Sequence, residues 1–277
     1  MDVITPKAYG STNVNQRRIA TKTFDILLAN NRQEFTEYLD IGSGDGGITK
    51  LLASRVPHRR LIGIDSVPAM TDYARQVNSM PTIKYITQDM SVLWPELSAD
   101  IRRLEGTVDL IFSNLCFMYF YDKSRTLSIC RRLLTTGGSI YANFILLGDV
   151  NKKLPPNERF NNFLSVDRQI QVWRRALADN GLAVDTFDVY NDKWFIKREL
   201  MIVFLPVLVC NYRSYFESID HYASECPDLS DAVFDIYTNP TTDRPNPNAW
   251  KQFVANENNN TEAIIHFQMV TLICHKN

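Results

Sequence analysis

Four glycines within ten residues form the part of this sequence with the clearest capacity for chemistry. The stretch YLDIGSGDGG, residues 38–47, starts apolar and then carries Asp40 and the loop residues Gly42, Ser43 and Gly44. Such spacing lets a ligand lie against the backbone, and it fits the G-x-G-x-x-G dinucleotide fingerprint. It also fits a nucleotide class in which an acid two residues before the first glycine takes part in binding. The loop alone predicts a nucleotide-type ligand and leaves open which one.

Polar side chains with ligand-binding chemistry also follow the next two expected strands. Asp65 and Ser66 come after the second apolar run, and Asp89 and Met90 come after the third. Because the carboxyl ends of parallel strands meet at one edge of a sheet, these residues should form one ligand track with the glycine loop. Asp65 can accept hydrogen bonds from both ribose hydroxyls. Asp89 can accept one from an adenine amino group while Met90 covers the ring.

The charge of Asp40 separates two candidate cofactors. A dinucleotide carries an anionic pyrophosphate, which a helix N-terminus attracts and a nearby carboxylate repels. S-adenosylmethionine instead presents a cationic sulfonium and a cationic amino group, and an acid at this place suits both. A ribose is common to the two cofactors, so Asp65 alone does not distinguish them. Asp40 therefore favours S-adenosylmethionine over NAD, with a dehydrogenase as the less favoured alternative.

Short apolar runs alternate with helical patterns and predict the elements that position these residues. Strands are expected at 36–41, 61–64, 82–87, 108–113, 139–147 and 182–190. Helices are expected over 11–30 and over 122–134, the second ended by the pair Gly137-Gly138. Ser66 is expected to cap the helix after the second strand. Strands and helices that alternate in this way predict an α/β fold whose parallel sheet is covered on both faces.

The bulk properties are those of a globular protein and set limits on function. The 277 residues are 45% hydrophobic and 22% charged, with a formal net charge of −1, so no electrostatic argument favours nucleic acid. The longest apolar run, 200–210, is shorter than the roughly 20 residues of a membrane span. The N-terminus lacks a secretory core, and the five scattered cysteines form no C-x-x-C pair. Reduced thiols and a cytoplasmic location are therefore expected.

Five motifs between residues 36 and 147 together resemble the class I S-adenosylmethionine-dependent methyltransferases. They are DIGSGDG at 40–46, GIDS at 63–66, QDM at 88–90, DLIFSN at 109–114 and LTTGG at 134–138. The resemblance implies a Rossmann-like class I methyltransferase fold, in which a mostly parallel seven-stranded sheet ends in an antiparallel strand, here 263–274. It also implies that S-adenosylmethionine is the cofactor, with Asn114 near its methionine part.

The corresponding prediction for domain organisation is a single methyltransferase domain over 1–277. Within it, 1–30 should be an N-terminal helical segment of the substrate site, and 31–147 should be the cofactor-binding core. Residues 191–260 should form a helical cap or insertion before the last strand.

The N-terminus and the segment after the fourth strand resemble the juvenile hormone acid methyltransferases of arthropods. In that family a tyrosine is followed by an asparagine four residues on and by a glutamine seven residues on. Tyr9, Asn13 and Gln16 keep these intervals. The family also carries F-S-x-x-x-L-H-W after the fourth strand. This chain has FSNLCFMY there, with Met118 and Tyr119 in place of the histidine and the tryptophan.

The resemblance implies that Gln16 and Tyr119 act as the catalytic pair that holds a substrate carboxylate, with Tyr9 and Met118 against the substrate. Tyr119 keeps an aromatic ring and one hydroxyl donor, whereas Met118 cannot donate a hydrogen bond. A carboxylate is ionised at neutral pH and needs no general base. We therefore expect a carboxyl O-methyltransferase for a small apolar carboxylic acid, a sesquiterpenoid such as farnesoic acid or juvenile hormone acid.

Two alternatives stay open on the same fold. The chain could methylate another small-molecule acceptor, or it could be a catalytically silent binding protein that keeps the cofactor loop. The four histidines show no metal-site or triad spacing, so no metal is expected. The sequence leaves the oligomeric state open.

Overall fold

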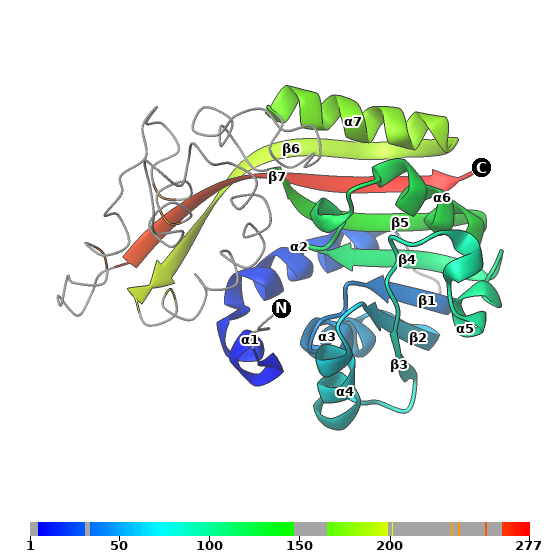
Figure 1. Ribbon diagram of the computed structural model, residues 1–277, viewed down its shortest axis with the longest axis horizontal. Coiled ribbons are helices and arrows are strands. Elements are labelled where there is room, and N and C mark those ends of the chain that lie inside the picture. Colours follow the sequence, from blue (N-terminus) through cyan, green and yellow to red (C-terminus); the bar gives the residue numbers. More distant parts are fainter. Residues whose placement is uncertain are drawn as a thin grey trace.

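The computed structural model describes residues 5–30, 34–146, 165–198 and 262–277, together with the single residues 201, 234, 238 and 253. These residues build a seven-stranded sheet with the order β3-β2-β1-β4-β5-β7-β6 (Figure 1). Its strands are β1 (Phe35–Ile41), β2 (His58–Asp65), β3 (Ile83–Thr87), β4 (Val108–Asn114), β5 (Leu134–Leu146), β6 (Leu182–Lys197) and β7 (Glu262–Lys276). Strands β1 to β5 pair in parallel, and β7 is antiparallel to both β5 and β6. The predicted α/β fold, with a mostly parallel sheet and an antiparallel last strand, is confirmed.

Helices lie on both faces of this sheet (Figure 1). They are α1 (Pro6–Thr12), α2 (Val14–Asn30), α3 (Gly47–Arg55), α4 (Pro68–Val77), α5 (Ala99–Arg102), α6 (Lys123–Leu133) and α7 (Val166–Asp179). Two single turns of 3-10 helix are η1 (Trp94–Glu96) and η2 (Phe117–Tyr119). The helix predicted over 11–30 is α2, which begins at Val14 after the separate short helix α1.

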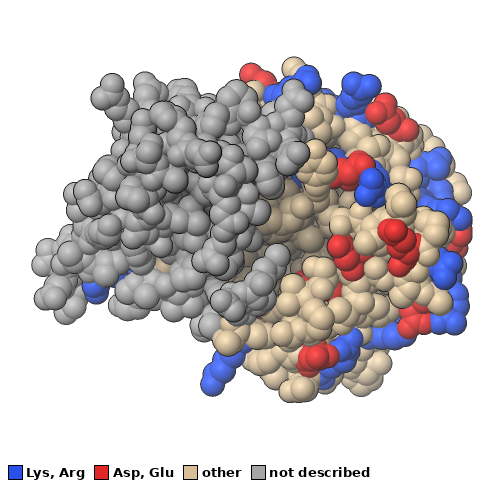
Figure 2. All heavy atoms as spheres, in the orientation of Figure 1, with Lys and Arg blue, Asp and Glu red and all other residues tan. Residues whose placement is uncertain are grey.

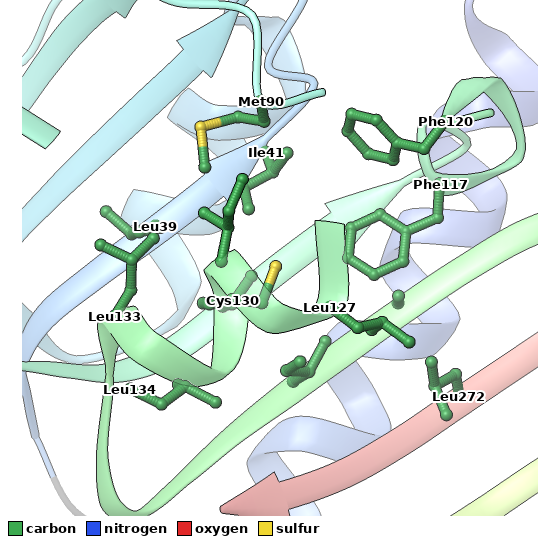
Figure 3. Close-up of a cluster of buried hydrophobic side chains, with 14 of the residues drawn as sticks. Leu39, Ile41, Met90, Phe117, Phe120, Leu127, Cys130, Leu133, Leu134 and Leu272 are labelled. Atoms are coloured by element: carbon green, nitrogen blue, oxygen red, sulfur yellow. The ribbon is translucent and has the colours of Figure 1, made fainter. Parts of the chain in front are cut away.

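The alternation of side chains along β1 divides the core into two layers. Leu39 points to one face, where it belongs to a buried cluster with Leu133 of α6 (Figure 3). Tyr38 points to the other face and belongs to a cluster with Phe24 of α2. Successive residues of a strand point to opposite faces, so a strand covered on both faces is apolar at nearly every position. Tyr38, Leu39 and Ile41 of β1 are accordingly apolar and buried on both faces, and the charged residues Glu37 and Asp40 are the exceptions.

The last two strands extend beyond the rest of the sheet. β7 pairs with β5 only from Gln268 onward, whereas it pairs with β6 from Glu262 onward. Residues 262–267 therefore form a two-stranded ribbon with β6, beyond the carboxyl ends of the parallel strands (Figure 1). Arg18 of α2 joins this ribbon through an ion pair with Asp192, at 2.7 Å.

Ser66 does not cap α4, so this prediction is wrong. The N-cap position is Val67, without a side-chain cap hydrogen bond. The Val67 amide donates instead to the Asp65 carboxylate at 2.9 Å. An aspartate that accepts from the amide two residues on closes an Asx turn, so Asp65 takes the role that was expected of Ser66.

The pair Gly137-Gly138 does not end α6, contrary to the prediction. The helix ends at Leu133, and β5 begins directly at Leu134. The pairing of β5 with β4 then breaks until Ser139. The two glycines lie in this irregular stretch of β5, where Gly137 has a φ of 79°.

Part of the expected insertion belongs to the sheet. β6 continues to Lys197, so residues 191–197 are strand and not the start of a cap. Most of the remainder of 191–260 lies outside the described residues. A cap in that range and a single domain over 1–277 stay predictions.

The described surface carries charges of both signs. Figure 2 shows lysine and arginine side chains interspersed with aspartate and glutamate. Within the described ranges, no helix is long and apolar enough to cross a membrane. The same ranges contain no group of three or more histidine, cysteine, aspartate or glutamate residues that could hold a metal ion.

Gly42→Ala should destabilise the protein more than Gly106→Ala. Both glycines have positive φ values, 84° and 70°, where alanine costs about 1–2 kcal/mol. A β-carbon on Gly42 would clash with Cys116, whereas one on Gly106 would meet nothing within 4 Å. Overpacking adds about 1–3 kcal/mol. Urea titrations should therefore give a clearly larger loss of unfolding free energy for Gly42→Ala, and equal losses would contradict the Cys116 contact.

Candidate functional site

The glycine loop between β1 and α3 folds back onto the end of β2. The amides of Gly42 and Ser43 both donate to the Ile64 carbonyl, at 2.8 and 3.0 Å. Gly42, Gly44 and Gly46 have positive φ values of 84°, 53° and 78°, which residues with a β-carbon rarely adopt. The loop therefore offers bare backbone at the carboxyl edge of the sheet, where ligands of such sheets bind.

Asp40 lies in β1, just before this loop. It is 2% exposed, and its carboxylate accepts a hydrogen bond from the Thr49 hydroxyl at 2.6 Å. Burial raises the pKa of Asp40 to about 7, an effect that the Thr49 bond opposes and the charge of Asp65 increases. A nearby cation favours the ionised form of a carboxyl group. Contact between Asp40 and the cationic end of a cofactor stays a prediction.

Asp65 connects the glycine loop with the loop after β2. One carboxylate oxygen accepts from the Gly44 amide at 2.9 Å, and the other accepts from the Val67 amide at 2.9 Å. Burial raises the pKa of Asp65, and the hydrogen bonds from backbone amides oppose this effect. The carboxylate is thus held in place beside the loop, where the ribose role is predicted. Ser66 next to it is exposed.

Asp89 and Met90 follow β3 but point to different surroundings. Asp89 is exposed, and one of its oxygens accepts from the Ser91 amide at 2.8 Å and from the Ser91 hydroxyl at 2.7 Å. Met90 is 3% exposed and packs in the same buried cluster as Ile41 (Figure 3). Core packing therefore accounts for Met90. The contacts of both residues with adenine stay predictions.

Tyr9 of α1 lies against the glycine loop. A β-carbon on Gly44 would lie 3.5 Å from the Tyr9 ring carbon Cε1, so the ring covers the bare backbone at this point. The pKa of the Tyr9 hydroxyl is raised by burial first, and then by the charges of Tyr119, Asp45 and Asp65. Tyr9 therefore lies close to Asp65, the acid predicted to bind the ribose, and to Tyr119, a predicted substrate residue.

Gln16 and Asn114 meet beside the end of β4. The Asn114 side-chain amide donates to the Gln16 backbone carbonyl at 3.3 Å, and the two side chains are only 6% and 8% exposed. Gln16 Oε1, Asn114 Oδ1 and Ser43 Oγ are buried and have no hydrogen-bond partner among the described residues. Buried polar atoms are normally paired. Such atoms at the edge of a glycine loop fit a polar ligand.

Met118 and Tyr119 lie in η2, the turn after β4. Leu115, just before this turn, has a positive φ of 54°, which is strained for a bulky residue. The Met118 sulfur accepts a hydrogen bond from the Ile145 amide at 3.4 Å, so this side chain packs on β5. Tyr119 is 55% exposed. The substrate roles of Met118 and Tyr119 stay predictions.

Asp45 is a residue of the loop that the sequence reasoning missed. Its carboxylate accepts from the Gly47 amide at 3.1 Å, and a β-carbon on Gly10 would lie 2.7 Å from one of its oxygens. Burial raises the pKa of Asp45, and the charge of Arg17 opposes this effect. Asp45 thus brings the N-terminal segment and the glycine loop together. An acid two residues before the first residue of a helix is a local signal that could have indicated it.

Lys123 is a second missed residue, and it fixes the turn η2. It is 3% exposed, and its ammonium group donates to the carbonyls of Phe117 and Met118 at 3.3 and 2.9 Å. The Nζ atom lies 5.0 Å from the centre of the Trp173 ring of α7, a cation–π contact. Burial lowers the pKa of Lys123 to about 7, while Cys116 opposes this effect. Because its partners come from distant elements, no local pattern marks it.

Comparison with known protein families decides the question that the glycine loop left open. Residues 39–142 match the family described as a methyltransferase domain. This part of the chain has the class I methyltransferase fold and matches a methyltransferase domain. The cofactor of such methyltransferases is S-adenosylmethionine, not a dinucleotide. The buried unpaired atoms of Ser43 and Asn114 fit a cofactor with polar and charged groups of this kind.

Individual relatives resemble this chain over part of its length. Malonyl-[acyl-carrier protein] O-methyltransferase from Paenibacillus sp. (strain JDR-2) is 32% identical over 142 residues, which cover 48% of this chain and 49% of that protein. Trans-aconitate 2-methyltransferase from Azoarcus sp. (strain BH72) is 30% identical over 114 residues, 41% of each chain. The chain thus spans about half or less of the length of these curated relatives. Neither is a juvenile hormone acid methyltransferase, so the arthropod subfamily stays a proposal.

A solved structure resembles the whole fold. The YcgJ protein from Bacillus subtilis superimposes with a TM-score of 0.56 and covers 93% of this chain and 99% of its own. The two sequences are 13% identical, so this likeness concerns the fold alone.

Asp65→Asn should weaken cofactor binding. The change removes one carboxylate oxygen from a group that already accepts from two backbone amides. Hydrogen bonds to charged groups are worth about 1.5–3 kcal/mol, so the Kd for S-adenosylhomocysteine should rise roughly ten- to a hundredfold in calorimetric titration. Asp72→Asn, an exposed acid of α4, is the matched control and should leave the Kd unchanged. An unchanged Kd in Asp65→Asn would argue against the ribose role.

Lys123→Met should change how stability depends on pH. The pKa of Lys123 is lowered from 10.5 to about 7 in the folded protein, so the unfolded chain binds more protons between these values. The free energy of unfolding of the wild type therefore gains a rising contribution from about pH 7 toward pH 10. Lys123→Met lacks this contribution, so the wild-type minus variant difference in urea titrations should rise over that range. A difference that stays constant with pH would contradict the lowered pKa. The control is Lys22→Met, at an exposed site of α2, for which the difference should stay constant.

Proposed function

We propose that the protein is a carboxyl O-methyltransferase, which transfers the methyl group of S-adenosylmethionine to a small acid. The observation that carries the proposal is the buried Gln16 side chain, which has an unpaired amide atom beside the two loops of the site. An amide that turns by 180° exchanges its oxygen for its NH2 group. This position can therefore present a donor to a carboxylate. The named relatives support an acid, since a malonyl group and trans-aconitate both carry carboxylates.

Carboxyl methylation requires little of a protein beyond alignment. When bound, S-adenosylmethionine supplies a methyl carbon on a positive sulfur, and a carboxylate oxygen forms the new bond as the carbon–sulfur bond breaks. A carboxylic acid with a pKa near 4 is ionised at neutral pH, so no residue has to remove a proton. Positioning alone contributes about 7–11 kcal/mol in favourable cases.

Gln16 and Tyr119 are the residues proposed to hold one carboxylate oxygen, so that the other oxygen faces the methyl group. Gln16 approaches from α2, and Tyr119 approaches from η2. Tyr9 lies beside Tyr119, and its raised pKa keeps the phenol protonated and able to donate. Lys123 is directed to backbone carbonyls of η2, so its role here is to hold the turn.

A sesquiterpenoid acid is the narrower proposal for the acceptor. It is supported by the intervals from Tyr9 to Asn13 to Gln16 and by the aromatic residues around η2. Two of these aromatic residues, Phe117 and Phe120, are buried and stack edge to face at 5.7 Å, so they form core. The sesquiterpenoid proposal therefore rests mainly on the N-terminal intervals, and the named relatives favour shorter acids as its competitors.

Methyl transfer to acids is tested with S-adenosylmethionine labelled in its methyl group. The panel comprises farnesoic acid, juvenile hormone acid, trans-aconitate, a malonyl thioester and fatty acids. Methyl esters release their label as methanol in mild base, so base-labile label identifies carboxyl methylation and the class of acid. Cofactor binding without transfer to any acid would contradict the proposal. It would favour another acceptor or a catalytically silent binding protein.

Gln16→Leu should lower turnover roughly ten- to a hundredfold, because a donor to a charged oxygen is lost. Leucine suits the buried position, and the affinity for S-adenosylhomocysteine should stay within about twofold of wild type. Gln171→Leu changes an exposed glutamine of α7 and should keep wild-type turnover. Unchanged turnover in Gln16→Leu would refute the carboxylate role of this residue.

A further inference from the structure

Asn13 presents a buried hydrogen-bond donor without a partner. The residue lies between α1 and α2 and is 1% exposed. Its Oδ1 atom accepts a hydrogen bond from Arg17 Nε at 2.8 Å. Its Nδ2 atom has no partner in the described part of the chain. A donor in this state is unfavourable unless a ligand pairs with it.

Arg17 determines which way the Asn13 amide points. A guanidinium group only donates hydrogen bonds, so the atom of Asn13 that faces it must be the oxygen. The NH2 group must then face the other way. Unlike the amide of Gln16, the Asn13 amide therefore has an assigned orientation.

The Asn13 donor lies at the border of the cofactor loop and the proposed acceptor site. Arg17 reaches the glycine loop, where a β-carbon on Gly47 would lie 2.9 Å from its Nη2 atom. Asn13 directly precedes α2, and its carbonyl accepts from the Arg17 amide at 2.9 Å, so Asn13 and Gln16 both belong to the first turn of this helix. Asp45 lies on the same glycine, since a β-carbon on Gly47 would also lie 3.3 Å from its Oδ1 atom, and the charge of Arg17 opposes the rise in its pKa.

We infer that Asn13 binds a carboxylate and that Arg17 is the positioning residue that aims its donor. This inference rests on the proposed function. Two carboxylates are candidates for this donor: that of the methionine part of the cofactor and that of the acceptor acid. An NH2 donor beside a guanidinium suits an anion. The cationic amino group of the cofactor would be repelled by the guanidinium and could accept no hydrogen bond from the Asn13 NH2 group.

The test compares two ligands in calorimetric titrations of the full chain. S-adenosylhomocysteine carries the methionine carboxylate, and 5′-methylthioadenosine lacks the amino-acid part. Asn13→Leu removes the donor, and Asn13→Asp keeps the shape while it replaces the donor with an acceptor. In both variants the Kd for S-adenosylhomocysteine should rise roughly ten- to a hundredfold, while that for 5′-methylthioadenosine stays within about twofold. If Asn13 instead met the cofactor's amino group, Asn13→Asp would bind S-adenosylhomocysteine more tightly, and the inference would be overturned.

The same variants distinguish the second source of the carboxylate. Unchanged affinity for S-adenosylhomocysteine, with a tenfold or larger rise in KM for the panel acid that the wild type methylates, assigns Asn13 to the acceptor. Unchanged values of both quantities overturn the inference. If the wild type methylates no acid, the proposed function fails on that result. The inference about Asn13 is then decided by S-adenosylhomocysteine alone, and an unchanged affinity for it overturns the inference.

Two further variants complete the test. Asn15→Leu, at a half-buried asparagine two residues along α2, is the matched control and should behave as wild type, since residues two apart face different sides of a helix. Arg17→Met leaves the Asn13 donor in place but frees the amide to turn. It should weaken the same ligand in the same direction by a smaller factor.

Discussion

The geometry of the site depends on Gly42 having no β-carbon. Cys116 packs directly against this glycine, so the segment after β4 lies on the loop after β1. This close approach brings η2 and Tyr119 beside the glycine loop and its covering residue Tyr9. Leu115 holds a strained backbone conformation in the same segment, and such strain persists only where surrounding contacts determine it. A larger residue at either side of the contact would separate η2 from the glycine loop.

The candidate site buries polar atoms at a cost in folding stability. Asn13, Gln16, Ser43 and Asn114 each bury a polar atom that has no partner among the described residues. Such an atom costs about 1–3 kcal/mol. The buried carboxyl group of Asp40 adds to this cost, as its raised pKa indicates. A ligand that pairs with these atoms would recover part of that free energy, which would couple ligand binding to folding stability.

The parallel sheet and its loop acids can be predicted from the sequence because their determinants are local. An apolar run, an acid and closely spaced glycines are enough to place β1 and its loop, and Asp65 lies where the end of β2 puts it. Residues whose role depends on tertiary contacts cannot be found in this way. Lys123 bonds to carbonyls of a separate turn, and the free donor of Asn13 exists only because Arg17 occupies the other side of its amide. The same limit explains the wrong prediction for Ser66, since a backbone amide had already taken Asp65 as its partner.

β7 lies between β5 and β6, although it follows both of them in the chain. During synthesis each of β2 to β5 finds a partner among the strands made before it, whereas β6 has none among the earlier strands that the structure describes. Until residues 262–276 have left the ribosome, β5 lacks its β7 neighbour and β6 lacks the one partner that the described strands offer it. Unpaired strands are templates for association with other chains. Pairing between distant segments is also slow. The order of the strands therefore makes the arrival of β7 the event that protects the nascent protein from aggregation.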